Sequence, residues 1–412
     1  MELKRDADRI INAALPKVMP DEAVAQALRG KCFDKGRVYL VAAGKAAWQM
    51  ANAASSILGD RLQAGVCVTK YEHVKGDIPR VLCFEAGHPV PDENSFRGTQ
   101  KALDLVSDLR KEDTVVFLLS GGGSALFEKP LIEGWELSEI TERLLACGAD
   151  ITEMNIIRKR LSAVKGGRFA KICAPAKVYG IVLSDILGDP LDMIASGPAY
   201  PDSSTCKQAL AVVEKYRLQL SDRVMDLLQE ETPKELDNVE NVVTGSVRNL
   251  CLAAAQACED LGYQPFILTD RLCCEAREAG SFLASIAKTH QDAKQSMAFL
   301  AGGETIVHLT GEGRGGRNQE LALAAAEGIS GLRDTALFSI GSDGTDGPTD
   351  AAGGYCDGYT KARLASKGID IYQVLQDNNA YMALEEAEGL IKTGATGTNV
   401  NDVAVLLIKR EM

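Results

Sequence analysis

The sequence predicts an α/β fold made of two domains whose sheets are mainly parallel. Its 412 residues exceed the size of one ordinary domain. Short apolar runs recur along the chain without the alternation of half-exposed strands, a pattern typical of strands covered on both faces. Helix-like stretches such as 46–58 and 318–329 separate these runs. Strands that alternate with helices favour βαβ units and therefore parallel sheets.

The expected strands end in loops that are rich in glycine or aspartate. In order, the strand-plus-loop segments are 38–45, 114–126, 177–189, 240–246, 262–270, 295–305 and 335–350. The most linker-like segment is 229–241, which is charged and poor in large apolar residues. We therefore predict one domain over 1–235 and a second over 236–412.

Composition and charge exclude several classes of function. A net charge of -12 repels nucleic-acid phosphates and anionic lipid, so neither is an expected partner. The 11 cysteines are scattered without zinc-site spacing, which fits a reducing compartment. The N-terminal stretch reads as an amphipathic helix without a signal-peptide core, and no apolar run is long enough to cross a bilayer. These features predict a soluble, cytoplasmic protein.

Polar residues gather where the expected strands end. In open parallel sheets, ligands bind beyond the carboxyl ends of the strands. The residues found there are Lys45, Gly121, Gly122, Gly123, Asp185, Gly303, Glu304, Asp343 and Asp346. This clustering predicts an enzyme that acts on a small molecule.

Two of these strand ends favour anion binding. Between Ser120 and Ser124 three glycines allow backbone N–H groups to approach an anion closely, although a purely structural turn is the alternative. Lys45 follows a buried strand, so its amine is expected at the ligand edge, unless it is an ordinary surface lysine.

The segment 148–168 is the most basic part of an acidic chain. On a helix, Asn155, Arg158 and Ser162 share one face, which predicts a local cationic pocket for an anionic substrate. A solvated basic helix is the alternative.

Two further loops carry acids and glycines. The aspartates of 183–190 and 342–350 suit Mg²⁺ or a general base, whereas a turn-forming role is the alternative. In the loop 309–320, Gly311, Gly313 and Gly316 satisfy G-x-G-x-x-G, but Arg314 and Arg317 are better suited to bind a phosphate or carboxylate than a dinucleotide.

Long motifs in this chain resemble those of the class II glycerate kinases, or glycerate 2-kinases, whose C-terminal domain is known as MOFRL. The matching stretches, which run over nearly the whole chain, are AAGKAA (42–47), LSGGGSALFEKP (119–130), CGADITEMNIIRKRLSAVKGGRFA (147–170), LSDILGDPLDMIASGP (183–198), GGETIVHLTGEGRGGRNQELALA (302–324), GSDGTDGPTDAAGG (341–354) and TGATGTNVNDVAVLLI (393–408). Departures are small: Arg160 stands where a histidine is common, which puts fine substrate tuning in doubt.

The resemblance implies a Rossmann-like N-terminal domain, a MOFRL-type C-terminal α/β domain and an active site in the cleft between them. It also implies ATP-dependent, Mg²⁺-assisted phosphorylation of D-glycerate at its 2-hydroxyl, with D-glycerate and ATP as the partners. The polar positions that match the family are Lys45, Asn155, Asp185, Arg317 and Asp343. Oligomeric state is left open between a monomer and a homodimer.

On this basis we expect Lys45 and Arg317 to neutralise the transferring phosphate and the glycerate carboxylate. Asn155 and Arg158 would orient the substrate. The candidate anion-binding groups are Ser120, Gly121, Gly122, Gly123, Ser124, Gly303 and Glu304. Asp185 and Asp343 would hold Mg²⁺ and accept the hydroxyl proton, and the sequence does not decide which does which. The alternative function is an NAD(P)H-dependent hydroxypyruvate reductase, and a non-enzymatic sugar-phosphate sensor is a second alternative.

Overall fold

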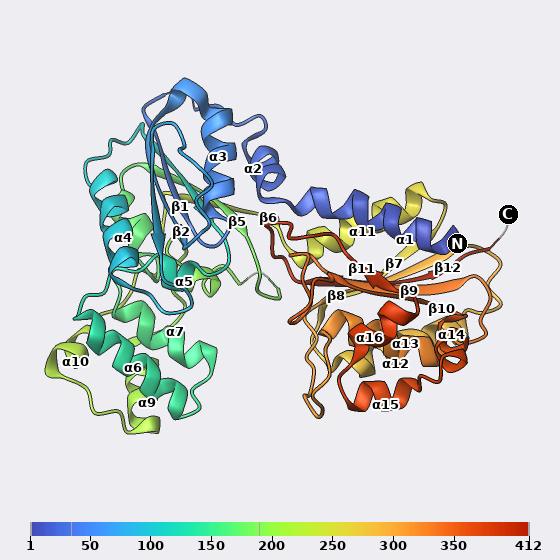
Figure 1. Ribbon diagram of the computed structural model, residues 1–412. Helices are drawn as coiled ribbons and strands as arrows, with labels where there is room; N and C mark the ends of the chain where they lie inside the picture. Colours follow the sequence, from blue (N-terminus) through green and yellow to red (C-terminus); the bar gives the residue numbers. More distant parts are fainter. Residues whose placement is uncertain (1, 34, 189, 411–412) are drawn as a thin grey trace. The chain divides into compact units, whose positions relative to one another are not determined.

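A computed structural model describes residues 2–33, 35–188 and 190–410, and the chain divides into two compact units. We call Ala23–Ser184 with Asp189–Thr244 the parallel-sheet unit. The mixed-sheet unit comprises Met1–Glu22, Asp185–Gly188 and Gly245–Met412. Figure 1 shows the helices and strands of both, coloured along the chain.

The parallel-sheet unit contains six strands in the order β3-β2-β1-β4-β5-β6. Their bounds are β1 (Val38–Ala43), β2 (Leu62–Lys70), β3 (Val81–Ala86), β4 (Thr114–Leu119), β5 (Lys177–Leu183) and β6 (Val239–Gly245). All pairings from β1 to β5 are parallel, as predicted. The central strands β1 and β4 are buried almost throughout, which explains why their sequences lack alternation.

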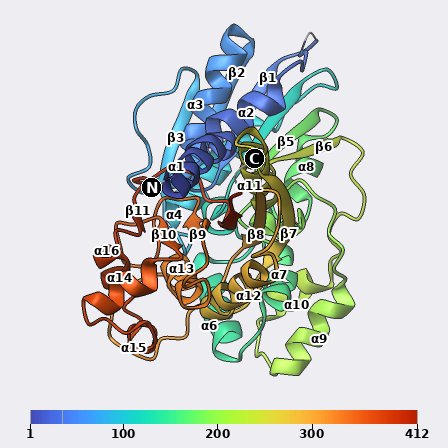
Figure 2. The same ribbon diagram turned by 90° about the vertical axis from the view of Figure 1, so that its right-hand side faces the viewer.

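Helices cover this sheet and also form a separate cluster. The helices are α2 (Pro20–Leu28), which begins in the other unit, α3 (Ala47–Leu58), α4 (Glu93–Leu105), α5 (Gly123–Leu126), α6 (Gly134–Ala146), α7 (Ile151–Arg160), α8 (Arg168–Cys173), α9 (Cys206–Tyr216) and α10 (Asp222–Gln229). Short 3-10 turns lie at Gly59–Arg61 and Ile194–Ser196. Figure 1 and Figure 2 both show α6, α7, α9 and α10 gathered at one end of the unit, where they share an apolar core of their own.

The mixed-sheet unit contains six strands in the order β11-β10-β9-β12-β8-β7. Their bounds are β7 (Gln264–Leu272), β8 (Met297–Gly303), β9 (Thr335–Gly341), β10 (Gly353–Asp357), β11 (Leu390–Ile391) and β12 (Asp402–Ile408). Four of them run in one direction, but only β7 and β8 form a parallel pair, because β12 lies antiparallel between β8 and β9. The predicted α/β class with two sheets is confirmed, and the second sheet is mixed.

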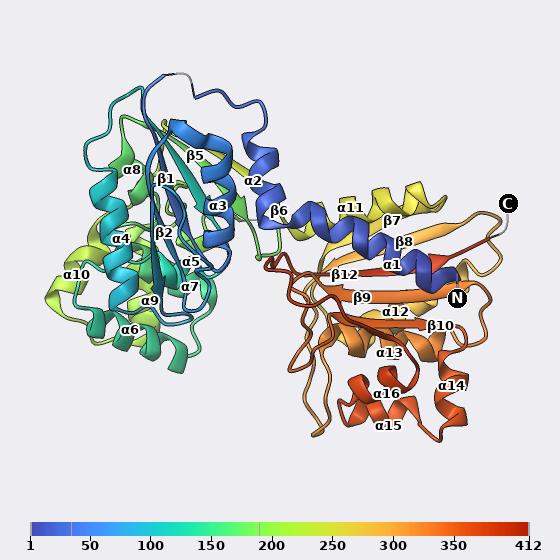
Figure 3. The same cartoon turned by 45° about the horizontal axis from the view of Figure 1, so that its top comes forward.

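Helices cover both faces of the mixed sheet. They are α1 (Glu2–Ala14), α11 (Val247–Asp260), α12 (Ala276–Thr289), α13 (Arg317–Gly328), α14 (Thr360–Ser366), α15 (Ile371–Gln376) and α16 (Ala380–Glu386), with a 3-10 turn at Leu15–Val18. Figure 3 shows α1 and α11 on one face and α12 and α13 on the other. No helix in the described part of the chain is long and apolar enough to span a membrane.

The division of the chain differs from the predicted boundary between residues 235 and 236. β6 lies beyond that boundary but completes the edge of the first sheet next to β5. The amphipathic helix α1 packs against α11, so the N-terminus of the chain belongs to the mixed-sheet unit. The charged, linker-like composition of 229–241 therefore indicates the loop that leads into an edge strand of the first sheet, and not a boundary between domains.

Candidate active site

The parallel sheet changes its winding direction between β1 and β4. The chain proceeds from β1 to β2 and β3 on one side, and from β4 to β5 and β6 on the other. A crevice for ligands forms at such a switch point, outside the carboxyl ends of the two strands. Lys45 follows β1 and Ser120 follows β4, so both lie at this point.

Hydrogen bonds join the two strand ends. The backbone N–H of Lys45 donates to the carbonyl oxygen of Gly121 at 2.8 Å, and that of Ala46 donates to Oγ of Ser120 at 3.1 Å. Gly122 has a φ of 83°, in the left-handed region that favours glycine. The predicted proximity of Lys45 to the loop Ser120–Gly123 is thus found in the structure.

A second group of predicted residues adjoins the same loop. The hydroxyl of Ser196 donates to Oδ1 of Asn155 at 2.8 Å, and Oγ of Ser124 lies 3.4 Å from Oγ of Ser196. Nη2 of Arg158 lies 3.5 Å from the carbonyl oxygen of Ser124. Asn155 and Arg158 therefore share the predicted helix face on α7, and that face is turned towards the glycine loop. Ser162, the third predicted member of this face, lies beyond the end of the helix at Arg160.

Ser196 was missed because it has no strand-end or charge signal in the sequence. It lies in the 3-10 turn Ile194–Ser196, where Ala195 and Ser196 both have left-handed φ values of 49° and 60°. Such a conformation costs free energy for residues with a Cβ atom. Here it places a buried hydroxyl against the amide of Asn155.

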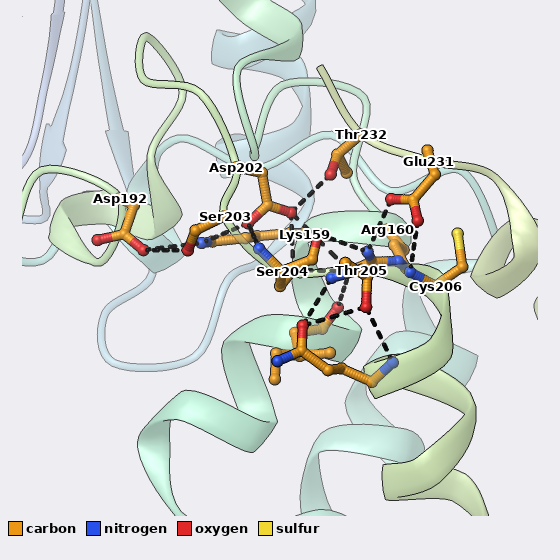
Figure 4. A network of polar contacts seen from close by, with 12 residues as sticks. Lys159, Arg160, Asp192, Asp202, Ser203, Ser204, Thr205, Cys206, Glu231 and Thr232 are labelled. Carbon is orange, nitrogen blue, oxygen red and sulfur yellow. Dashed lines mark hydrogen bonds and ion pairs between the residues drawn. The ribbon is translucent and has the colours of Figure 1, made fainter. Parts of the chain in front are cut away.

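The other basic side chains of 148–168 are not part of a cationic pocket, contrary to the prediction for this segment. Nζ of Lys159 lies 3.0 Å from Oδ1 of Asp202, and both side chains are buried. Figure 4 shows this pair within a network of polar contacts. Nη1 of Arg160 donates to Oγ of Ser204 at 2.9 Å, and its Nη2 lies 3.4 Å from Glu231.

Two further cations of this segment bind other protein groups. Lys165 forms a fully buried ion pair with Glu128, and burial lowers the pKa of the Lys165 amine to about 8. Nη1 of Arg168 donates to the carbonyl oxygen of Ser162 at 2.7 Å. Charge alone predicted a pocket, but buried carboxylates and carbonyls bind Lys159, Arg160 and Arg168. Lys165 also donates to the carbonyl oxygen of Ser124 at 2.8 Å, so it lies beside the glycine loop with Arg158, although Glu128 neutralises its charge.

The mixed-sheet unit contains a pocket of about 890 Å³. It is formed by loops that follow β8 and β9 and by the glycine-rich loop before α13. Its polar lining includes Glu304, Arg317, Glu320, Asp343 and Asp346. The pocket is thus rich in carboxylates.

Arg317 at the start of α13 is bound by two carboxylates. Its Nε and Nη2 donate to Asp402 at 2.5 and 3.0 Å, and its Nη1 donates to Glu304 at 3.0 Å. Burial alone would lower the pKa of Arg317, but these two acids outweigh it and the pKa is raised. The structure brings Glu304 and Arg317 together, and Glu304 serves as a partner of the guanidinium.

Asp402 was missed for a topological reason. A fully parallel sheet would place the N-terminus of β12 at the edge opposite the ligand edge. Because β12 is antiparallel, Asp402 pairs in register with Gly303 at the end of β8 and with Gly341 at the end of β9. The first residue of β12 therefore reaches the same edge as Glu304 and Asp343.

The glycine-rich loop does not present a dinucleotide site. A side chain at Gly313 would collide with Asn379, and one at Gly316 would collide with Asp346. The carboxylate of Asp346 accepts the N–H groups of Asn318 and Gln319 at 3.1 and 2.9 Å. A pyrophosphate would require this helix terminus, and the carboxylate already occupies it.

The two predicted metal ligands differ in their positions. Asp343 lines the pocket, and its Oδ1 accepts the N–H of Thr345 at 3.0 Å. Asp185 follows β5 but is grouped with the mixed-sheet unit, where its carbonyl oxygen accepts from Nδ2 of Asn401 at 3.1 Å. Asp189, the second aspartate of the same loop, lies outside the described residues. Within the described ranges, three or more His, Cys, Asp or Glu side chains nowhere gather as a metal site would require.

Comparison with known families covers most of the chain. Residues 6–229 match a family described as a domain of unknown function, DUF4147, and residues 297–402 match the MOFRL family. Among curated proteins, the chain is 52% identical to the D-glycerate 2-kinase of Thermotoga maritima, with 98% of each chain covered. It is 39% identical to the glycerate 2-kinase of Pyrococcus horikoshii, over 99% of this chain and 98% of the relative.

Two other comparisons bear on fold and function. A crystal structure of glycerate kinase from Thermotoga maritima matches with a TM-score of 0.95 at 50% identity, covering 99% of both chains. A protein of Agrobacterium vitis named a putative hydroxypyruvate reductase is 38% identical, over 97% of this chain and 93% of its own length.

Proposed function

The chain belongs to the MOFRL family of glycerate 2-kinases, and we propose that it transfers the γ-phosphoryl group of ATP to the 2-hydroxyl of D-glycerate. The names of the relatives from Thermotoga maritima and Pyrococcus horikoshii support the acceptor and its hydroxyl. The structural observation that carries the proposal is the junction of Lys45 with the loop Ser120–Gly123 at the switch point.

In this proposal, the parallel-sheet unit binds anionic groups through its backbone and its cations. Lys45, the N–H groups of Gly121 and Gly122, and Arg158 neutralise negative charge on phosphate or carboxylate, whereas the N–H of Gly123 donates to the carbonyl oxygen of Ser120 at 3.3 Å. Asn155, whose amide is fixed by Ser196, orients the substrate. Because phosphoryl transfer needs mainly positioning and charge neutralisation, these groups suffice without a covalent intermediate.

The mixed-sheet unit contributes Arg317 and carboxylates. The guanidinium of Arg317, held by Asp402 and Glu304, is proposed to neutralise the transferring phosphate. The oxygen-rich lining of the pocket fits Mg²⁺, which prefers carboxylates together with substrate phosphates, and Asp343 and Asp185 are the proposed ligands. When bound, the ion would neutralise charge on the nucleotide phosphates.

The reductase activity suggested by the names of some relatives is a weaker candidate. A nicotinamide dinucleotide needs a free helix terminus for its pyrophosphate, whereas Asp346 caps α13 at the G-x-G-x-x-G loop. The glycines of that loop serve packing against residues 377–379.

The proposal is tested with the purified full chain, D-glycerate, ATP and MgCl₂. We expect ADP formation that requires D-glycerate, with 2-phosphoglycerate identified by ³¹P NMR. The control replaces D-glycerate with L-glycerate. Formation of 3-phosphoglycerate would refute the regiochemistry. Failure to form any phosphoglycerate, together with NADH oxidation by hydroxypyruvate, would refute the kinase and support the reductase.

A further inference from the structure

His88 lies at the switch point beside the residues assigned above. It follows β3 as Lys45 follows β1 and the glycine loop follows β4, so the order of the strands brings all three to one edge of the parallel sheet. A methyl group built on Gly122 would lie 3.0 Å from Nε2 of His88 and 3.1 Å from Cγ of Lys45. The imidazole edge and the lysine side chain therefore both lie against Gly122.

The protein provides no hydrogen-bond partner for this imidazole. Across the described part of the chain, neither ring nitrogen of His88 forms a hydrogen bond, although the ring is half-buried. The nearby His73, by comparison, places its Nδ1 2.9 Å from the carbonyl oxygen of Lys45. A half-buried imidazole without a partner is available to a ligand that binds at the switch point.

The electrostatic surroundings keep His88 neutral. Burial, followed by the charges of Lys45, Lys70 and His73, lowers its pKa below the ordinary value of 6.5. These are the charged or titratable groups that face the ring, and all of them oppose its protonation. At neutral pH one ring nitrogen therefore carries a lone pair that can accept a proton.

We propose that His88 is a catalytic residue whose imidazole accepts the proton of the acceptor hydroxyl during phosphoryl transfer. The inference rests on the proposed kinase function. The O–H bond of the acceptor breaks as its oxygen bonds to the γ-phosphorus of ATP, the proton passes to His88, and ADP leaves with the electrons of the broken P–O bond. His88 then returns the proton to solvent. Asp185 and Asp343 are thereby free to act as metal ligands only.

The variant His88→Gln tests this role, because glutamine preserves a polar group but cannot take a proton. We expect kcat to fall by about 10²–10⁴-fold, the range for removal of a general base. The KM for D-glycerate should change by no more than a few-fold. In the wild type, log kcat should decline on the acid side as His88 becomes protonated, and the variant should lack this decline. His290→Asn, in the mixed-sheet unit, is the matched control and should retain wild-type rates.

Chemical rescue provides an independent measurement. In His88→Ala, added imidazole should restore part of kcat, and more basic imidazoles should restore more. A kcat for His88→Gln within three-fold of wild type would overturn the inference. So would a decline of log kcat at acidic pH that remains in His88→Gln as in the wild type. If both variants fail to fold, the pH dependence of kcat of the wild-type protein provides the test. A wild-type kcat that does not decline at acidic pH would overturn the proposed role of His88 as a general base. Lack of wild-type turnover would instead refute the kinase function itself.

Discussion

The candidate functional residues of the two units are arranged in opposite ways. In the parallel-sheet unit, backbone groups of a glycine loop stand next to Lys45 and Arg158. In the mixed-sheet unit, carboxylates line a pocket and two of them bind Arg317. The first arrangement attracts anions, whereas the second fixes one cation rigidly and offers oxygen ligands to another. The two units therefore differ in the sign of the charge that each can bind.

The largest expected effect comes from removing one candidate catalytic cation from each unit. Lys45→Ala and Arg317→Ala should each lower kcat by about 10³-fold, because each removes charge that stabilises the transferring phosphoryl group. Steady-state kinetics with D-glycerate and ATP measure the loss. Lys177→Ala, at the exposed opposite end of β5, is the control.

The two variants should differ in stability, which sharpens the comparison. Arg317→Ala leaves Asp402 buried without its partner and should also cost about 1–3 kcal/mol of folding free energy. Lys45→Ala should cost less folding free energy than Arg317→Ala, because Lys45 is only partly buried whereas Asp402 is buried. Equal destabilisation, or near-normal turnover in both variants, would contradict the division of roles.

Neighbouring residues on α7 provide the next test. Lys159→Met removes the nearer of the two cations beside the buried carboxylate of Asp202, with Arg160 remaining 3.9 Å away, and should cost about 1–3 kcal/mol, with kcat per folded molecule little changed. Arg158→Met should lower kcat/KM by about 10–100-fold with little loss of stability, because it removes a cation beside the glycine loop. Urea unfolding and steady-state kinetics distinguish them. If instead Lys159→Met lowers kcat/KM and Arg158→Met lowers stability, the substrate binds on the side of α7 that carries Lys159.

The smallest expected effect concerns the pH dependence of stability. Burial raises the pKa of Asp346 to about 6 from its ordinary 3.8, so the folded state binds this proton more tightly than the unfolded state. Its contribution to stability is fully present below pH 3.8 and is lost as pH rises through about 6. Between pH 4 and pH 6 the loss is about 2 kcal/mol.

Asp346→Asn should remove this part of the pH dependence, because an amide oxygen can still accept from the N-terminus of α13 but does not ionise. Denaturant unfolding of both proteins at a series of pH values provides the measurement. Asp377→Asn, at the exposed C-terminus of α15, is the control. If the free energy of unfolding of Asp346→Asn falls between pH 4 and pH 6 as steeply as that of the wild type, another group causes the pH dependence.

Strand-end reasoning predicted much of the candidate site. It placed Lys45 beside the glycine loop, since parallel strands bring their carboxyl ends to one edge. It could not place Asp402, because the direction of a buried strand is not encoded in its apolar pattern. It missed Ser196 and His88, whose positions depend on a left-handed turn and on strand order.

The prediction for the basic helix failed for a different reason. Asp202 and Glu231, which bind Lys159 and Arg160, lie far from them in the sequence. A run of cations therefore shows neither which members are paired nor which face a ligand. The domain boundary was misplaced similarly, because linker-like composition does not reveal that β6 still belongs to the preceding sheet.

The position of α1 has a consequence for synthesis of the chain. This helix leaves the ribosome long before α11, against which it packs, because α11 begins only at Val247. At a translation rate of about 5–20 residues per second, α11 is synthesised on the order of tens of seconds after α1. Until then the apolar face of α1, with Ile10 and Ile11, lacks the helix against which it packs. During that time the parallel-sheet unit can complete its own sheet. The nascent chain thus carries an exposed apolar helix face ahead of a finished domain, which is a natural binding target for a chaperone.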